Sequence, residues 1–148
     1  MIAERVTTAP WPEHIAIIGA GTMGLGIAGR RVRLTDATAE LAQHARQNLV
    51  ARVSAHVAAG LLPEGALARL DTVEMRDDIP AAFAGAEFIL EAVPEDRAAK
   101  AAVLALCTEH APREVVIASN SSSFPIDGLA AFVRQPTRFL GTHWFNPP

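Results

Sequence analysis

The chain has 148 residues, a net charge of −3 and one cysteine, Cys107. Half of the residues are hydrophobic, which excludes a disordered chain and suffices for the core of one domain. The absence of a basic run argues against binding to nucleic acid or anionic membranes, a lone cysteine fits a reducing cytoplasm, and no apolar stretch reaches the roughly 20 residues that span a bilayer. Residues 1–13 are expected to form an irregular tail and residues 14–148 one domain.

The first predicted element is a strand at residues 14–18 that runs into a glycine-rich turn. Gly19 permits the tight turn, Gly21 lets the backbone approach a pyrophosphate, and Gly24 lets the next helix pack closely on the strand. Unpaired N–H groups at the start of that helix would hold the phosphate. The alternative is an ordinary turn between a strand and a helix. The residues predicted to bind a dinucleotide here are Gly19, Ala20, Gly21, Thr22, Met23 and Gly24.

The second predicted strand, residues 32–36, ends in Asp36. A carboxylate at this place accepts hydrogen bonds from the adenosine ribose and repels a 2′-phosphate, so NAD is favoured over NADP. The connection before the strand is short, because Asp36 follows Gly24 by 12 residues whereas about 20 are usual. We therefore expect irregular geometry, or missing residues, around residues 29–30.

The remaining sequence alternates helical and strand patterns. Apolar residues on a four-residue spacing predict a helix over 37–59, and a proline opens a second short helix over 63–70. This helical excursion exceeds what a crossover needs, so we expect it to project from the sheet, with Arg46 and Arg52 either packing or meeting substrate phosphates. Further strands are predicted at 72–75, 88–93, 115–119 and 137–143, and further helices at 79–84, 95–110 and 126–133.

Apolar strands that alternate with helices predict a Rossmann-type, doubly wound, mostly parallel sheet with helices on both faces. Ligands of such sheets bind at the carboxyl ends of the strands. This rule places five residues along one edge, namely Gly19, Asp36, Val93, Asn120 and His143.

His143 follows the last predicted strand at this edge. A histidine has a pKa near neutrality and can take a proton from an alcohol while hydride leaves for a nicotinamide. The serine-rich run at 119–123 offers hydroxyl groups to a substrate oxygen, but such runs also make turns and helix caps. Each feature alone is more often structural than catalytic. No metal-ligand spacing occurs, so no metal is expected.

Four segments together resemble the NAD-binding domain of the L-3-hydroxyacyl-CoA dehydrogenase family, and the resemblance extends over the predicted domain. It implies that His143 is the catalytic base for the 3-hydroxyl group and that Ser122 hydrogen-bonds the reacting oxygen. The residues expected to contact NAD, beside the glycine turn, are Asp36, Glu95, Lys100, Asn120 and Asn146. The four segments are residues 17–24, 91–95, 119–123 and 141–148.

The resemblance implies NAD-dependent oxidation of a 3-hydroxyacyl thioester, carried by CoA or acyl carrier protein, to the 3-oxoacyl form, or the reverse. It implies a cytoplasmic homodimer in fatty acid metabolism. The family's glutamate partner of the histidine and its helical C-terminal domain fall outside these residues, so we expect the chain to supply the cofactor domain and to be incomplete for catalysis. Two other functions stay open: a dehydrogenase of a small free 3-hydroxy acid or carnitine-like alcohol, and a non-catalytic NAD-binding or structural module.

Overall fold

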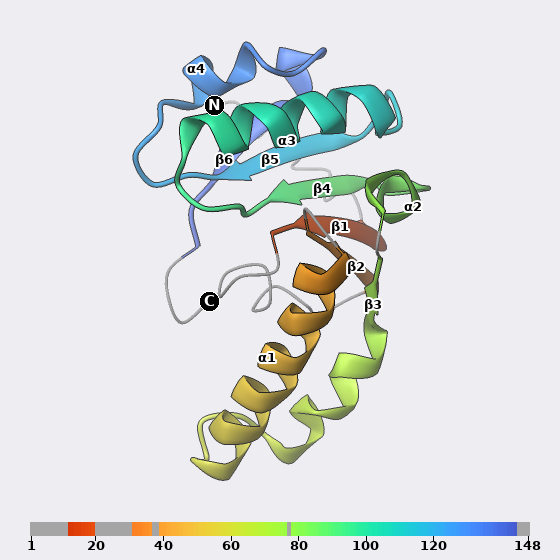
Figure 1. Ribbon diagram of the computed structural model, residues 1–148, viewed down its shortest axis with the longest axis vertical. Helices are drawn as coiled ribbons and strands as arrows, with labels where there is room; N and C mark the ends of the chain where they lie inside the picture. The colour runs from red at the N-terminus through yellow and green to blue at the C-terminus, as the bar shows by residue number, and fades with distance from the viewer. Residues whose placement is uncertain (1–11, 20–30, 37–38, 77, 145–148) are drawn as a thin grey trace, which may run out of the picture.

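The computed structural model describes residues 12–19, 31–36, 39–76 and 78–144 of the chain (Figure 1). These residues form one six-stranded sheet in the order β3-β2-β1-β4-β5-β6, and every neighbouring pair is parallel. The Rossmann-type parallel sheet predicted from the sequence is therefore confirmed. The strands are β1 (His14–Ile18), β2 (Arg31–Thr35), β3 (Val73–Met75), β4 (Phe88–Glu91), β5 (Val116–Asn120) and β6 (Phe139–Thr142).

Helices cover both faces of the sheet. The sheet faces alternate along each strand, so Ile17 and Leu90 pack on one side while Ile18 and Ile89 pack on the other. The α-helices are α1 (Ala39–Ala58), α2 (Ile79–Phe83), α3 (Arg97–His110) and α4 (Ile126–Ala130). Short 3₁₀ helices are η1 (Glu64–Ala66), η2 (Ala68–Thr72) and η3 (Pro136–Arg138).

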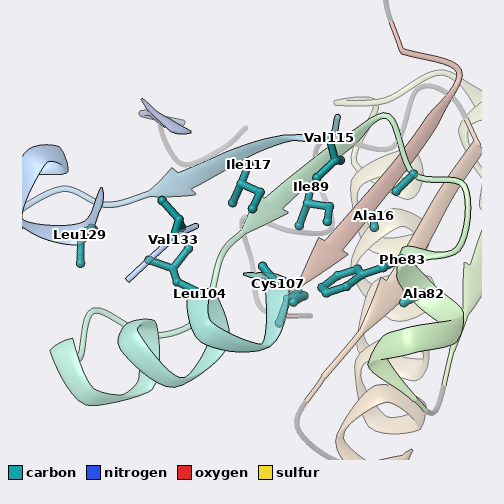
Figure 2. Close-up of a cluster of buried hydrophobic side chains, with 12 residues drawn as sticks. Ala16, Ala82, Phe83, Ile89, Leu104, Cys107, Val115, Ile117, Leu129 and Val133 are labelled. Atoms are coloured by element: carbon teal, nitrogen blue, oxygen red, sulfur yellow. The ribbon is translucent and has the colours of Figure 1, made fainter. Parts of the chain in front are cut away.

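The larger apolar cluster joins the sheet to α2, α3 and α4 (Figure 2). Phe83 from α2 and Cys107 from α3 are fully buried there, next to the strand residues Ala16 and Ile89. Burial, with a smaller effect of the Glu91 charge, raises the pKa of the Cys107 thiol to about 12. The thiol is therefore protonated and serves as a small apolar side chain.

The helical excursion predicted after the second strand is present as α1 followed by η1 and η2, and it extends away from the sheet (Figure 1). Near the sheet, Ala45 and Leu49 of α1 pack on β2 and β3. The second short helix predicted at 63–70 is present as two 3₁₀ turns and not as one continuous helix. Gly65 lowers helix propensity, and no side chain of η1 is buried to compensate for it.

Arg46 donates a hydrogen bond from Nη1 to the backbone oxygen of Val73 (3.4 Å) and so ties α1 to β3. This is a packing contact, while a phosphate contact of Arg46 or Arg52 stays a prediction. In the part of the chain that the structure describes, no helix has the length and apolar character needed to cross a membrane.

Gly19 ends β1 in a conformation that only glycine adopts without strain. Its φ is +99°, and a Cβ built on it would lie 2.5 Å from the backbone carbon and oxygen of Ala92. Its N–H donates a hydrogen bond to the Thr35 oxygen (3.1 Å). The end of β2 and the backbone that follows β4 thus meet at Gly19, directly after β1, where the sequence predicted the tight turn.

Gly19→Ala is expected to lower the free energy of unfolding by about 2–4 kcal/mol, because it adds both backbone strain and a clash with backbone atoms. Urea denaturation measures this loss. Gly60→Ala is the matched control: Gly60 also has a positive φ, +69°, but nothing lies within 4 Å of a Cβ built there. The control should lose clearly less stability, and equal losses would show that the contact with Ala92 is not what excludes a side chain.

Candidate active site

The carboxyl ends of the strands meet at one edge, as the parallel-sheet rule requires. Ile18 pairs with both Thr35 and Glu91, Glu91 pairs with Ser119, and Asn120 pairs with Thr142. The residues at these strand ends and directly after them are consequently neighbours across the sheet. They include all five positions predicted for this edge, Gly19, Asp36, Val93, Asn120 and His143.

Ser122 and His143 lie in contact at this edge. Ser122 Oγ is 2.9 Å from His143 Nε2, and both residues are exposed. Ser122 lies in the loop after β5, whereas His143 directly follows β6, so the pairing of these two strands brings them together. A hydroxyl and an imidazole nitrogen at this distance can hydrogen-bond one ligand oxygen from two sides, and the imidazole can exchange a proton with it.

Glu95 holds the loop that carries Ser122. Its Oε1 accepts hydrogen bonds from the Ser121 hydroxyl (2.6 Å), the backbone N–H groups of Ser122 (3.0 Å) and Ser123 (2.8 Å), and the Ser123 hydroxyl (2.9 Å). Partial desolvation raises the pKa of Glu95, but the bonds from Ser121 and Ser123 and the charge of Lys100 outweigh it and lower the pKa to about 2. Glu95 is therefore ionised across the physiological range and braces the serine loop.

Glu95→Gln is expected to remove a pH dependence of stability. Because the pKa of Glu95 falls from 4.5 to about 2 on folding, the unfolded chain binds more protons in this range, and wild-type stability falls as the pH drops through it. The stability difference between wild type and variant should be largest above pH 4.5 and shrink toward pH 2. Urea denaturation across this range measures it, and a difference that does not change with pH would contradict the role of the Glu95 charge.

Lys100 is buried beside Glu95. Its side chain and that of Glu91 have no exposed area, and Lys100 Nζ is 2.9 Å and 3.0 Å from the two Glu91 carboxylate oxygens. The same ammonium is 3.3 Å from Glu95 Oε2. The sequence predicted Lys100 as a cofactor contact. The structure instead draws its ammonium inward to Glu91, and a direct contact with NAD stays a prediction.

Asn120 connects the ends of β5 and β6. Its side-chain oxygen accepts a hydrogen bond from the Trp144 N–H (3.1 Å), and its backbone oxygen accepts one from Lys100 Nζ (3.4 Å). Asn120 thus holds the residue that follows His143. Its side chain has a structural partner here, and its predicted contact with NAD is untested.

Sequence reasoning missed Glu91 and Ser119. Both are buried, and the Ser119 hydroxyl donates a hydrogen bond to the Glu91 carboxylate, which also accepts one from the Val93 N–H (2.8 Å). The available signal was a charged residue at the end of an otherwise apolar strand, since such residues are rarely buried without a partner.

The switch point of the sheet fits a dinucleotide. At β1 the strand order runs to β2 on one side and to β4 on the other, which is where doubly wound folds bind such ligands. Gly19 and the half-buried Asp36 lie side by side there. Gly19 has no Cβ, so its backbone can be approached closely, and the Asp36 carboxylate can accept hydrogen bonds from ribose hydroxyl groups. Residues 20–24, residues 29–30 and Asn146 lie outside the described residues. Within the described ranges, no cluster of three or more His, Cys, Asp or Glu side chains could hold a metal.

Residues 14–148 match the model of the 3-hydroxyacyl-CoA dehydrogenase NAD-binding domain. The chain is 37% identical over 145 residues to 3-hydroxyadipyl-CoA dehydrogenase of Escherichia coli, an alignment that covers 91% of the chain and 30% of that protein. It is 34% identical over 147 residues to 3-hydroxybutyryl-CoA dehydrogenase of Mycobacterium tuberculosis, with 91% and 50% covered. It is 37% identical over 143 residues to 5-formyl-3-hydroxy-2-methylpyridine 4-carboxylate 5-dehydrogenase of Mesorhizobium japonicum, with 92% and 45% covered.

Among solved structures, (S)-3-hydroxybutyryl-CoA dehydrogenase of Ralstonia eutropha superimposes with a TM-score of 0.82 and 29% identity, and the match covers 92% of this chain and 50% of that one. The chain thus spans half or less of the length of these relatives. The family match includes the serine loop, the segment around Glu95 and the His143 region whose contacts are described above. The chain belongs to the 3-hydroxyacyl-CoA dehydrogenase family, as its NAD-binding domain.

Proposed function

We propose that the protein catalyses NAD-dependent oxidation of a 3-hydroxyacyl thioester to the 3-oxoacyl form, or the reverse, and that this chain supplies the cofactor domain. The observation that carries the proposal is the Ser122–His143 pair, 2.9 Å apart at the ligand edge of the sheet. When bound, NAD accepts a hydride from the carbon that bears the hydroxyl group. His143 Nε2 takes the hydroxyl proton, and Ser122 Oγ hydrogen-bonds the same oxygen.

NAD is assigned to the part of the ligand edge that follows β1 and β2. The glycine turn at 19–24 receives the pyrophosphate, and Asp36 receives the adenosine ribose. Residues 14–148 are the NAD-binding domain in this proposal, and the tail predicted at residues 1–13 lies, apart from residues 12–13, outside the described residues. Further contacts to NAD are assigned to Glu95, Lys100, Asn120 and Asn146.

The proposed substrate is a CoA thioester, since two of the relatives are named for the oxidation of hydroxyadipyl-CoA and hydroxybutyryl-CoA. An acyl-carrier-protein thioester presents the same reacting group and is the alternative carrier. A role in fatty acid metabolism, a cytoplasmic location and a homodimer form the rest of the proposal.

A second candidate is oxidation of a small free substrate. The relative from Mesorhizobium japonicum favours it, because that enzyme is named for a free pyridine carboxylate and is as similar to this chain as the hydroxyadipyl-CoA enzyme. The two candidates share the Ser122–His143 chemistry and differ in what surrounds the rest of the substrate.

Protein purified from its natural gene tests both candidates. NADH binding is measured by fluorescence, and NADH formation is followed with 3-hydroxybutyryl-CoA, its acyl-carrier-protein thioester and free 3-hydroxybutyrate. The proposal predicts NADH binding and the highest kcat/KM for a thioester. A higher kcat/KM for the free acid would favour the second candidate, and NADH binding without turnover of any substrate would identify a non-catalytic module.

A further inference from the structure

A buried group of charges lies under the Ser122–His143 pair and has no part in the proton and hydride transfers. Glu91, at the end of β4, and Lys100, in the first turn of α3, have no exposed side-chain area and form an ion pair at 2.9 Å. The Ser119 hydroxyl and the Val93 N–H also donate to Glu91. The carboxylate therefore has a full set of donors and a fixed orientation.

The ammonium of Lys100 connects this buried group to the surface. It is 3.3 Å from Glu95 Oε2 and 3.4 Å from the backbone oxygen of Asn120. Glu95 uses its other oxygen, Oε1, for the N–H groups of Ser122 and Ser123. The two oxygens of one carboxylate thus bind the buried cation on one side and the serine loop on the other.

The Glu95 side chain is one third exposed and would have several rotamers available without this cation. Lys100 in turn needs Glu91, because a long, flexible ammonium side chain stays buried only beside a compensating charge. An apolar pair of similar volume would pack α3 on the sheet equally well. Unlike an apolar pair, the ion pair also holds the positive charge of Lys100 next to Glu95 Oε2.

We propose that Glu91 is a positioning residue: through Lys100 it fixes the Glu95 carboxylate, and Glu95 fixes the loop that holds Ser122 against His143. The assignment rests on the proposed function for what Ser122 and His143 do, but the positioning itself is a property of the free protein. Glu91 acts on turnover only through the geometry of the loop, so its loss should lower kcat more than it changes the affinity for NADH.

The test is the double variant Glu91→Gln/Lys100→Met, which removes both buried charges and keeps their volume. Amide hydrogen exchange is measured on the protein without substrate. We expect exchange at the N–H groups of Ser122 and Ser123 to become faster by about tenfold or more, while core amides of β1 and β4 keep their protection. Ser119→Ala takes one donor from Glu91, keeps the ion pair and should give a smaller increase at the same two amides.

Glu74→Gln is the matched control, since it breaks ion pairs with Arg33 and Arg76 away from the serine loop and should leave both amides unchanged. Unchanged exchange at Ser122 and Ser123 in the double variant and in Ser119→Ala would overturn the proposal. In Ser119→Ala, which leaves Lys100 and Glu95 in place, a fall in kcat with unaltered NADH affinity supports it. If wild-type protein oxidises no substrate, the proposed function fails, and the exchange data alone decide the positioning.

Discussion

Replacing His143 by alanine is expected to lower kcat for oxidation of 3-hydroxybutyryl-CoA by roughly 10²–10⁴-fold, the usual contribution of a positioned general base. NADH affinity should stay nearly unchanged, because the glycine turn and Asp36, which are assigned to the pyrophosphate and the adenosine ribose, follow β1 and β2. Initial rates and a fluorescence titration of NADH on the same preparation give both quantities.

His110→Ala provides the control for the loss of a histidine, since His110 ends α3 outside the described site. It should retain wild-type kcat. If His143→Ala lost NADH binding in proportion to kcat, His143 would be a structural residue. If it kept full turnover, the base would have to be another group.

Glu91→Gln alone is expected to lower the free energy of unfolding by about 3 kcal/mol, because it leaves the ammonium of Lys100 buried without its main partner. Glu95, 3.3 Å away, keeps the loss from being larger. Adding Lys100→Met removes the uncompensated charge and should recover most of the stability. Urea denaturation of the two variants and the wild type measures both steps.

The exposed carboxylate Glu74 sets the scale for this comparison. The pKa of Glu74 is lowered by hydrogen bonds and charge from Arg76 and Arg33, yet Glu74→Gln should cost much less stability than Glu91→Gln, since solvent screens exposed pairs. If Glu91→Gln lowered the free energy of unfolding no more than Glu74→Gln, then Glu91 would not be needed to compensate the buried charge of Lys100. If the double variant were as unstable as the single one, lost packing would be the cause.

The sheet was predictable because its buried strands are apolar and are separated by helical patterns. Three isoleucines in β1, the glycine after it and the alternation with helical patterns sufficed for a parallel doubly wound sheet. Element ends were less accurate. The helix predicted from residue 95 begins at Arg97, because the Asp96 side chain accepts a hydrogen bond from the Ala99 N–H (2.8 Å) and caps the first turn. The helix predicted at 63–70 forms as two 3₁₀ turns, because Gly65 lowers helix propensity and no side chain of η1 is buried to compensate for it.

The candidate site was predictable to the extent that it follows from strand ends. The parallel-sheet rule placed Asn120 and His143 at one edge, and the family resemblance singled out Ser122. The 2.9 Å contact between Ser122 and His143 depends on the loop path after β5, which no local pattern encodes. The Glu91–Lys100 pair was missed for a related reason: its partners lie on a strand and a helix joined by a turn, so their contact is a tertiary one.

The most direct test of the account is the initial rate of NADH formation when protein from the natural gene receives 3-hydroxybutyryl-CoA and NAD, compared with the rate with NADP. We predict reduction of NAD and far slower reduction of NADP, because Asp36 follows β2 beside Gly19 and its carboxylate repels a 2′-phosphate. Absence of any NADH formation, or a faster rate with NADP, would contradict the account.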